Sequence, residues 1–261
     1  MRSLSIAATG MLAQQLNVEV LSNNIANMNT TGFKRSRAEF QDLLYQTQRR
    51  VGSTSSDSGT VVPAGVQVGL GVKTAAVYMV AEQGNLESTE NTFDLAIQGE
   101  GWFKIKLPDN STAYTRSGSF QIGPDGEIVT ADGYTVDPGI NIPAGAIDVT
   151  INPTGEVLVK IAGQVTDTNA GQITLSKFPN SAGVQAVGDN LFRETPASGN
   201  PSDGTPGSDG YGTLLQGFLE TSNVNTVAAI TNLIRAQRAY EMNSKVIQTS
   251  DEMLNTLNRM R

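Results

Sequence analysis

Carboxylates are the side chains best able to do chemistry in this sequence, because its 261 residues include no histidine and no cysteine. Their absence removes Ser-His-Asp and Cys-His nucleophiles and nearly all zinc and copper sites. Paired carboxylates can still cleave a glycan, and the candidates are Asp125, Glu127 and Asp132. These residues lie in Gly-rich turn sequences, where Asp commonly bonds the local backbone. We therefore favour a turn role and keep a glycan-binding or glycan-cleaving β domain as the alternative.

Spacing and charge disfavour other kinds of site. Asp125-Gly126-Glu127 lacks the spacing of an EF-hand loop. Neither Gly69-Leu70-Gly71 nor Gly99-Glu100-Gly101 continues to the third glycine of a dinucleotide fingerprint. The formal net charge of −7 disfavours nucleic acid as a partner. We therefore expect no catalytic, cofactor-binding or metal-binding residues, no cofactor and no enzyme activity.

Two conspicuous groups have ordinary structural roles. Trp102 and Phe103 begin an apolar run and are expected to anchor a β core rather than form a ligand platform. A small basic cluster falls between Lys34 and Arg50, and we expect it to be a solvated face or to contact acidic neighbours. No window approaches about 18 consecutive apolar residues, so we expect no direct membrane insertion. The first residues also predict no cleaved secretory signal.

Glycine and proline placement defines the elements that must position any site. All ten prolines, and every glycine except Gly10 and Gly32, lie between residues 51 and 222. Long helices are therefore expected over residues 3–28 and 224–259. Both ends are slightly basic while the middle is acidic. This pattern indicates that the termini belong together and the middle folds separately.

Each expected helix carries an apolar stripe with heptad spacing, which is typical of helices that pack on other helices. The expected subunit-interface residues are Leu4, Met11, Val18, Leu21, Ile25, Met28, Leu233, Tyr240, Ile247, Leu254 and Leu257.

Such helices are costly to order alone. Backbone ordering costs about 1–2 kcal/mol per residue, whereas burying about seven stripe side chains returns about 10–20 kcal/mol. Three outcomes stay open: packing on the chain's own β domain, packing on other copies, or binding a membrane surface. We favour other copies, and the Asn-, Gln-, Ser- and Thr-rich polar faces disfavour the membrane.

The middle of the chain predicts a mostly antiparallel β domain, so the fold class is α+β. Two stretches, 52–59 and 195–212, are polar enough that we expect mobile or partner-ordered loops. The expected strands cover residues 93–98, 102–106, 113–116, 127–130, 149–152, 157–161 and 173–178.

Four separated motifs resemble the bacterial flagellar rod and hook family. Three of them cover residues 91–103, 114–120 and 238–247. In the first motif, at the exit of the first helix, consecutive Asn residues compete with helix hydrogen bonds and Gly32 permits a turn. The residues of that motif that we single out are Asn23, Asn24, Ile25, Ala26, Asn27, Thr31, Gly32, Phe33 and Lys34.

The resemblance implies a structural subunit that polymerises with itself into a rigid hollow drive shaft, transmitting torque from motor to hook. Implied partners are further copies of itself, other flagellar rod and hook subunits, the surrounding basal-body ring proteins and the flagellar export apparatus. The implied location is the flagellar basal body, spanning the periplasm, with type III export and no cleaved signal peptide. The implied division is a coiled-coil-like inner tube domain (1–32 plus 223–261), an extended connector with a rod-type extension (33–65), and a β-rich outer domain (66–222).

Within that family, the length, the single β region and the segment 45–65 look most like subunits of the distal rod. In those subunits the extension is associated with bracing neighbours so that the shaft stays straight. A proximal rod or hook-type axial subunit stays the alternative.

Overall fold

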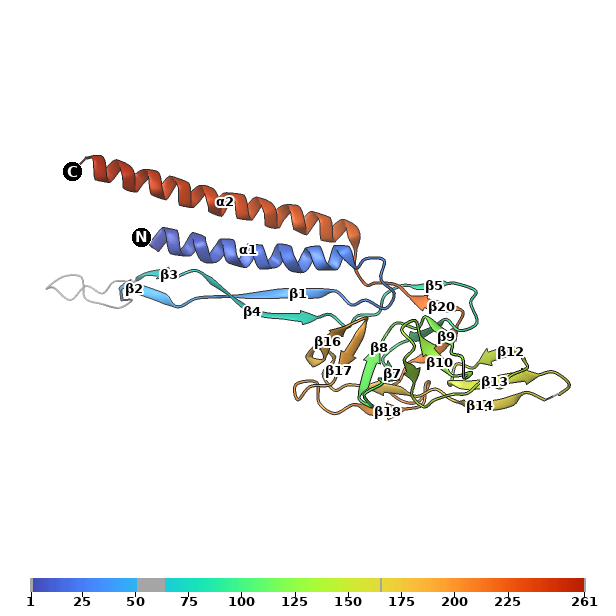
Figure 1. Ribbon diagram of the computed structural model, residues 1–261. Coiled ribbons are helices and arrows are strands. Elements are labelled where there is room, and N and C mark those ends of the chain that lie inside the picture. Colours follow the sequence, from blue (N-terminus) through green and yellow to red (C-terminus); the bar gives the residue numbers. More distant parts are fainter. Residues whose placement is uncertain (1, 51–63, 165, 261) are drawn as a thin grey trace. The chain divides into compact units, whose positions relative to one another are not determined.

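The computed structural model describes residues 2–50, 64–164 and 166–260, and it has the α+β class expected from the sequence. Helices form both ends, and the chain between them is mostly antiparallel β structure (Figure 1). Internal contacts divide the chain into two compact units, which we call unit 1 and unit 2. Unit 1 comprises the described residues of Met1–Ile25, Ser36–Val77 and Thr226–Arg261, and unit 2 those of Ala26–Arg35 and Tyr78–Asn225. The three-part division of an assembled shaft stays a prediction.

Both helices of unit 1 follow from the placement of helix-breaking residues. α1 spans Arg2–Ala26 and α2 spans Thr226–Arg259, each end within two residues of the expected one. Inside these bounds the sole glycine or proline is Gly10. Neither helix, over its described residues, has a stretch long and apolar enough to cross a membrane.

α1 and α2 run antiparallel and side by side along a seam of small residues (Figure 1). The hydroxyl of Ser250 lies 3.4 Å from that of Ser3. One heptad further, Gly10 faces Asn243, and a Cβ on Gly10 would come within 2.9 Å of the side-chain nitrogen Nδ2 of Asn243. Ala236, a heptad beyond Asn243, is 2% exposed. Small side chains let the two backbones approach closely, so the seam buries little apolar area.

A narrow β ribbon lies along the other side of α1 in unit 1 (Figure 1). The side-chain amide of Asn24 both donates to the carbonyl and accepts from the amide of Ser36, at 2.8 Å each. The Thr9 hydroxyl accepts from the amide of Val72 at 3.4 Å. The ribbon pairs β1 (Ser36–Asp42) with β4 (Val72–Met79), and β2 (Tyr45–Arg49) antiparallel with β3 (Val66–Gly69).

Unit 2 is built on a nine-stranded sheet with the main order β16-β17-β8-β7-β11-β10-β9, to which β15 and β18 add beside β7. A three-stranded sheet, β12-β13-β14, and the antiparallel pairs β6-β19 and β5-β20 complete the unit. The bounds are β5 (Leu86–Ser88), β6 (Leu95–Gln98), β7 (Trp102–Lys106), β8 (Thr112–Thr115), β9 (Phe120–Ile122), β10 (Ile128–Thr130), β11 (Thr135–Val136), β12 (Ala146–Ile151), β13 (Glu156–Ile161), β14 (Thr168–Gln172), β15 (Leu175–Lys177), a 3-10 turn η1 (Ser181–Gly183), β16 (Gln185–Gly188), β17 (Leu191–Arg193), β18 (Ser202–Gly204), β19 (Thr213–Gln216) and β20 (Phe218–Glu220).

Alternating apolar side chains of these strands form the core of unit 2. Phe103 and Phe120 meet edge to face with centroids 5.1 Å apart, and both are buried. Trp102 lies in a smaller cluster with Tyr114 and Phe178, so its expected role as a core anchor is confirmed. The seven strands expected from alternation are confirmed, with small shifts at their ends, as β6, β7, β8, β10, β12, β13 and β15.

The prediction of a poorly packed loop over residues 195–212 is wrong. Ser198 is completely buried, and its hydroxyl accepts from the amide of Thr195 at 2.9 Å. The Tyr211 hydroxyl donates to the carbonyl of Ser202 at 3.0 Å, and β18 within this segment pairs with β15. Short polar side chains bond the turns of the backbone here, so low hydrophobicity did not prevent packing. The other polar stretch, 52–59, lies outside the described residues.

Candidate functional site

The interface residues expected from the heptad stripes lie on the helices or just beyond α1, and each keeps accessible surface in the single chain. Met28, Tyr240 and Leu257 are exposed. The apolar positions buried within the two helices are held by alanines, namely Ala7, Ala13, Ala229 and Ala236, whereas the larger stripe side chains are half-buried or exposed. Their contact with other copies stays a prediction. The half-buried members are Leu4, Met11, Val18, Leu21, Ile25, Leu233, Ile247 and Leu254.

α2 also presents apolar side chains on the side away from the seam. Val227 is 74% exposed and Ile234 is 53% exposed near its start, and Met242 and Met253 are 62% and 57% exposed further along. At about 100° per residue, Val227 and Ile234 fall roughly opposite Ala236, whereas Met242 and Met253 lie to one flank, about 100–120° from it. A helix that is apolar on opposite sides needs more than one packing partner. The predicted heptad stripes did not include Val227, Ile234 and Met242, although the spacing of seven residues between Val227 and Ile234 indicates a further apolar row on the helix.

Of the carboxylates considered for a glycan site, Asp125 and Asp132 lie in hairpin turns of unit 2, whereas Glu127 forms an isolated β-bridge with Asn141. Asp125 falls between β9 and β10, where the amide of Gly126 donates to the carbonyl of Gly123 at 3.0 Å. Asp132 falls in the next turn, between β10 and β11, and both aspartates are exposed, whereas Glu127 is half-buried. The two aspartates occupy the turn positions that the sequence favoured.

The signature segment after α1 passes through one sharp turn at Gly32. Its φ is +70°, and a Cβ there would come within 2.5 Å of the backbone nitrogen of Ser117. Glycine fits because it tolerates positive φ and has no Cβ. The amide of Gly32 donates to the carbonyl of Glu220 at 2.7 Å, and the side chain of Asn190 donates to the carbonyl of Thr31 at 3.2 Å. The expected glycine turn is confirmed, and it also attaches the segment to β20.

The other signature residues shape the end of α1 and the turn beyond it. The hydroxyl of Thr30 bonds the side chain of Asn27 at 3.2 Å, and the amide of Phe33 donates to the carbonyl of Thr30 at 3.2 Å. Asn24 bonds β1, as described above, rather than capping its own helix. Asn23 and Ala26 are exposed. The motif is therefore a structural junction in this chain.

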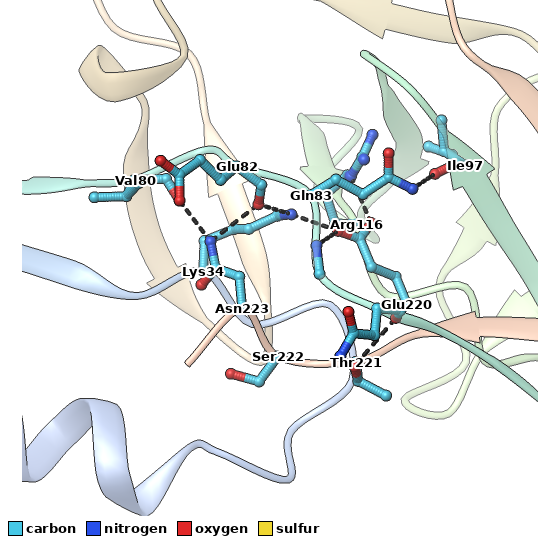
Figure 2. A network of polar contacts seen from close by, with 12 residues as sticks. Lys34, Val80, Glu82, Gln83, Ile97, Arg116, Glu220, Thr221, Ser222 and Asn223 are labelled. Carbon is cyan, nitrogen blue, oxygen red and sulfur yellow. Dashed lines mark hydrogen bonds and ion pairs between the residues drawn. The ribbon is translucent and has the colours of Figure 1, made fainter. Parts of the chain in front are cut away.

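Lys34 is the last residue of the signature motif. It is buried in unit 2, within a network of charged side chains (Figure 2). Its ammonium contacts Oε1 of Glu220 and donates to the carbonyl of Glu82 at 2.7 Å. Oε2 of the same carboxylate accepts from Nε of Arg116 at 2.9 Å. We call Lys34, Arg116 and Glu220 the ion triad. Their side chains are at most 4% exposed.

Backbone groups complete the bonding of the ion triad. The two terminal nitrogens of Arg116 donate to the carbonyls of Gly101 and Gly99. The amide of Gly84 donates to Oε1 of Glu220 at 2.8 Å. Throughout the described residues, every buried side-chain nitrogen and oxygen has a hydrogen-bond partner. The triad therefore meets the usual condition for burying charge, which is full pairing.

Asn223, three residues before α2 in the sequence, belongs to the same network (Figure 2). Its side-chain oxygen accepts from the amide of Arg35 at 2.7 Å. Its side-chain nitrogen donates to the carbonyls of Val80 and Glu82, at 3.0 and 2.9 Å. One amide group thus ties together three segments that are far apart in the sequence.

Burial governs the electrostatics of the ion triad. Desolvation lowers the pKa of Lys34, and the neighbouring Glu220 carboxylate opposes that effect. Desolvation also lowers the pKa of the Arg116 guanidinium, again against the attraction of Glu220. Two cations share one carboxylate, so Glu220 is the counter-charge on which both depend.

Sequence reasoning missed the ion triad. The basic cluster was expected to be a solvated face or to contact acidic neighbours, and the second outcome holds for Lys34, which contacts Glu220, and for Arg35, which pairs with Glu82 at 3.0 Å. The burial of Lys34 was not predicted. A usable signal was Arg116, a charge that directly follows the buried strand β8. Glu220 gave no local signal, since 186 residues separate it from Lys34.

These features define the class of protein. It is a structural α+β protein whose paired terminal helices leave apolar side chains exposed. Its β unit contains a buried network of charged side chains. Residues 4–34 match the family described as flagella basal body rod protein. Residues 96–159 match the flagellar hook protein FlgE/F/G D1 domain, and residues 215–260 the flagellar basal body rod FlgEFG protein C-terminal family.

Full-length relatives agree with these matches. A protein of Caulobacter vibrioides named flagellar basal-body rod protein FlgG is 58% identical over 261 residues, covering 100% of both chains. Proteins of the same name from Agrobacterium fabrum and Bacillus subtilis are 54% and 40% identical, covering 99% and 98% of each chain. The chain belongs to the family of flagellar basal-body rod proteins.

Proposed function

We propose that this chain is a structural subunit of the distal part of the flagellar basal-body rod. Its helices join those of other copies, and the subunits polymerise helically into a rigid hollow drive shaft. The family assignment rests on similarity along the whole chain, with 58% identity to the Caulobacter vibrioides relative. A place in the proximal rod or the hook is the alternative.

The observation that carries polymerisation is the exposed apolar surface of α2. Leu257 is 59% exposed and Tyr240 is 44% exposed, in addition to the side chains away from the seam. A soluble monomer rarely leaves so many large apolar side chains in water, because each gains roughly 1.5–3 kcal/mol on full burial. We propose that the contacts between copies are heterologous and that their rotation does not close into a ring, so that they propagate a helix.

The seam between α1 and α2 explains why that surface remains available. Ala229 and Ala236 occupy buried positions on α2, and their small side chains satisfy the pairing of the two helices. The larger side chains are therefore free for neighbours. In an assembled rod we expect them to form the core of a coiled-coil-like tube.

The finer proposals follow from the same role. Partners are other copies, adjoining rod and hook subunits, the ring proteins around the rod, and the flagellar export apparatus. The location is the basal body across the periplasm, reached by export without signal cleavage. The role is mechanical, so we propose no catalysis and no cofactor.

Replacing Ile247 by Asp tests polymerisation, because it places a charge on the half-buried stripe of α2. We expect rods to be lost in electron micrographs while unit 2 keeps its fold, since burying an unpaired carboxylate between helices is unfavourable. The matched control is Gln248→Asp, the same charge at the adjacent exposed position, which should assemble. Normal rods from the Ile247→Asp variant would contradict the proposal.

A further inference from the structure

Three of the four passages by which the chain enters and leaves unit 2 meet at the ion triad and Asn223. The chain crosses between the units after residues 25, 35, 77 and 225. Lys34 lies beside the second crossing, Val80 beside the third, and Asn223 beside the last. The contacts of the triad and of Asn223 join all three of these passages within unit 2 (Figure 2).

We propose that Lys34, Arg116, Glu220 and Asn223 are positioning residues that lock these passages to one place in unit 2. Load carried by the helices then enters unit 2 through buried charged side chains instead of through loose backbone. The origin of that load rests on the proposed function, whereas the lock itself is a property of the single chain.

Buried ion pairing makes the lock stiff. Displacing the passage at Lys34 would separate its ammonium from Glu220 and from the carbonyl of Glu82. Glu220, whose side chain is fully buried, would at the same time lose one of its two cationic partners. Small movements therefore meet a steep electrostatic resistance that a solvated ion pair does not give.

Three backbone amides donate hydrogen bonds at or next to these side-chain contacts, so their protection from exchange depends on the contacts. The amide of Val80 donates to the carbonyl of Arg35 at 2.9 Å, and the amide of Gly84 donates to Glu220. The amide of Arg35 donates to Asn223. Exchange of these three amide protons measures how often the passages open.

Amide exchange by NMR on the full-length chain tests the lock. In Lys34→Met, Arg116 and Glu220 still form a balanced pair, so unit 2 stays folded. We nevertheless expect exchange at Arg35, Val80 and Gly84 to accelerate about tenfold or more, although their own hydrogen-bond partners remain, since about 1.4 kcal/mol of lost closure gives that factor. Amides inside β7 and β8 should change less than about twofold.

The matched control is Lys104→Met, which removes a partly accessible lysine paired with Asp137 and Asp203 elsewhere in unit 2. It should leave the three reporter amides unchanged. A second variant, Asn223→Ala, should accelerate exchange at Val80 as well as at Arg35. Wild-type exchange at Val80 and Gly84 in Lys34→Met, or equal acceleration in Lys104→Met, would overturn the lock.

Rod assembly and swimming, measured in cells that carry each variant, distinguish the lock from the proposed function. Lys34→Met should assemble rods in normal number but lose swimming in viscous medium. Ile247→Asp should lose rods while keeping wild-type exchange at Arg35. If Lys34→Met cells swim as well under viscous load as the wild type, the lock carries no load and the proposal fails, whether or not the chain builds rods.

Discussion

Glu220 has a special place among the acidic residues, because it serves two buried cations and also bonds the amide of Gly84. Removing either cation leaves one carboxylate with one positive partner. Removing the carboxylate leaves Lys34 and Arg116 buried close together without a counter-charge. The three residues are therefore unequal in their effect on folding, although they belong to one network.

Glu220→Gln should destabilise unit 2 by about 3–5 kcal/mol, the usual cost of leaving buried charge unpaired. Lys34→Met should cost less, about 1–3 kcal/mol, because Glu220 keeps one cationic partner and the carbonyl of Glu82 keeps its bond from Asn223. Urea unfolding followed by the fluorescence of Trp102, the single tryptophan, measures both in unit 2.

The ranking of the two variants is the decisive result of that experiment. Lys104→Met, at a partly accessible ion pair, should fall within about 1 kcal/mol of the wild type. Equal losses in Glu220→Gln and Lys34→Met would show that net charge balance does not govern this site.

Single residues were the hardest part to predict from the sequence. Gly32 was predictable, because a glycine between a helix and an extended segment readily adopts the positive φ that a sharp turn requires. Contact of Lys34 with an acidic residue was one of two expected outcomes, but its burial was not predicted, since basic residues follow it in the sequence. Its partners Arg116 and Glu220 come from distant strands, and a sequence pattern contains no information about which buried charges will meet.

At the scale of elements, the heptad spacing predicted both helices but not the faces by which they pair. The prediction rested on the large apolar residues of each helix. It did not include the small residues that form the seam, which are Ser3 and Gly10 on α1 and Ala236 and Ser250 on α2. A periodic pattern identifies a helix strongly. It does not say which of two neighbouring rows packs within the chain and which packs on other copies.

The register of the seam can be tested with engineered cysteines, because the sequence contains none. Ser3→Cys/Ser250→Cys places two thiols where the hydroxyls lie 3.4 Å apart. Oxidation of assembled rods should close this pair within one chain, so that the dissociated product keeps the mass of a single subunit. Ser5→Cys/Ser250→Cys is the control, since Ser5 is two residues from Ser3 and therefore about 200° around α1 from the seam. Equal yields from the two pairs would contradict the antiparallel register.

The strands of unit 2 were largely predictable, whereas those of the ribbon were not. Buried strands such as β7 and β13 alternate or run apolar, and turn sequences separate them. β1 and β2 are mostly exposed and polar, so no hydrophobic pattern marked them as strands. Polar contacts with α1, such as that of Asn24 to Ser36, hold the ribbon instead.

At the scale of the whole molecule, unit 2 is discontinuous in sequence, because Ala26–Arg35 belongs to it while the next segment belongs to unit 1. In a dilute monomer we expect protease to cut unit 1 first, since its helices lack their neighbours. The surviving core should consist of two pieces, one containing 26–35 and the other 78–225, held together by Lys34 and Gly32. Native mass spectrometry of the digest measures this.

In Lys34→Met the short piece should dissociate from the digested core, because the contacts of Lys34 with Glu220 and Glu82 are gone. Survival of the intact chain, with both helices resistant to protease at high dilution, would show instead that unit 1 is stable without other copies.

The separation of the triad in the sequence also sets the order in which the molecule can close. Glu220 follows Lys34 by 186 residues and Arg116 by 104. A growing chain that has not reached residue 220 holds two cations for which desolvation is unfavourable. Contacts of such long range form late. Closure of the β unit therefore waits until most of the polypeptide is present, and a nascent N-terminal portion stays pliable until its final strand arrives.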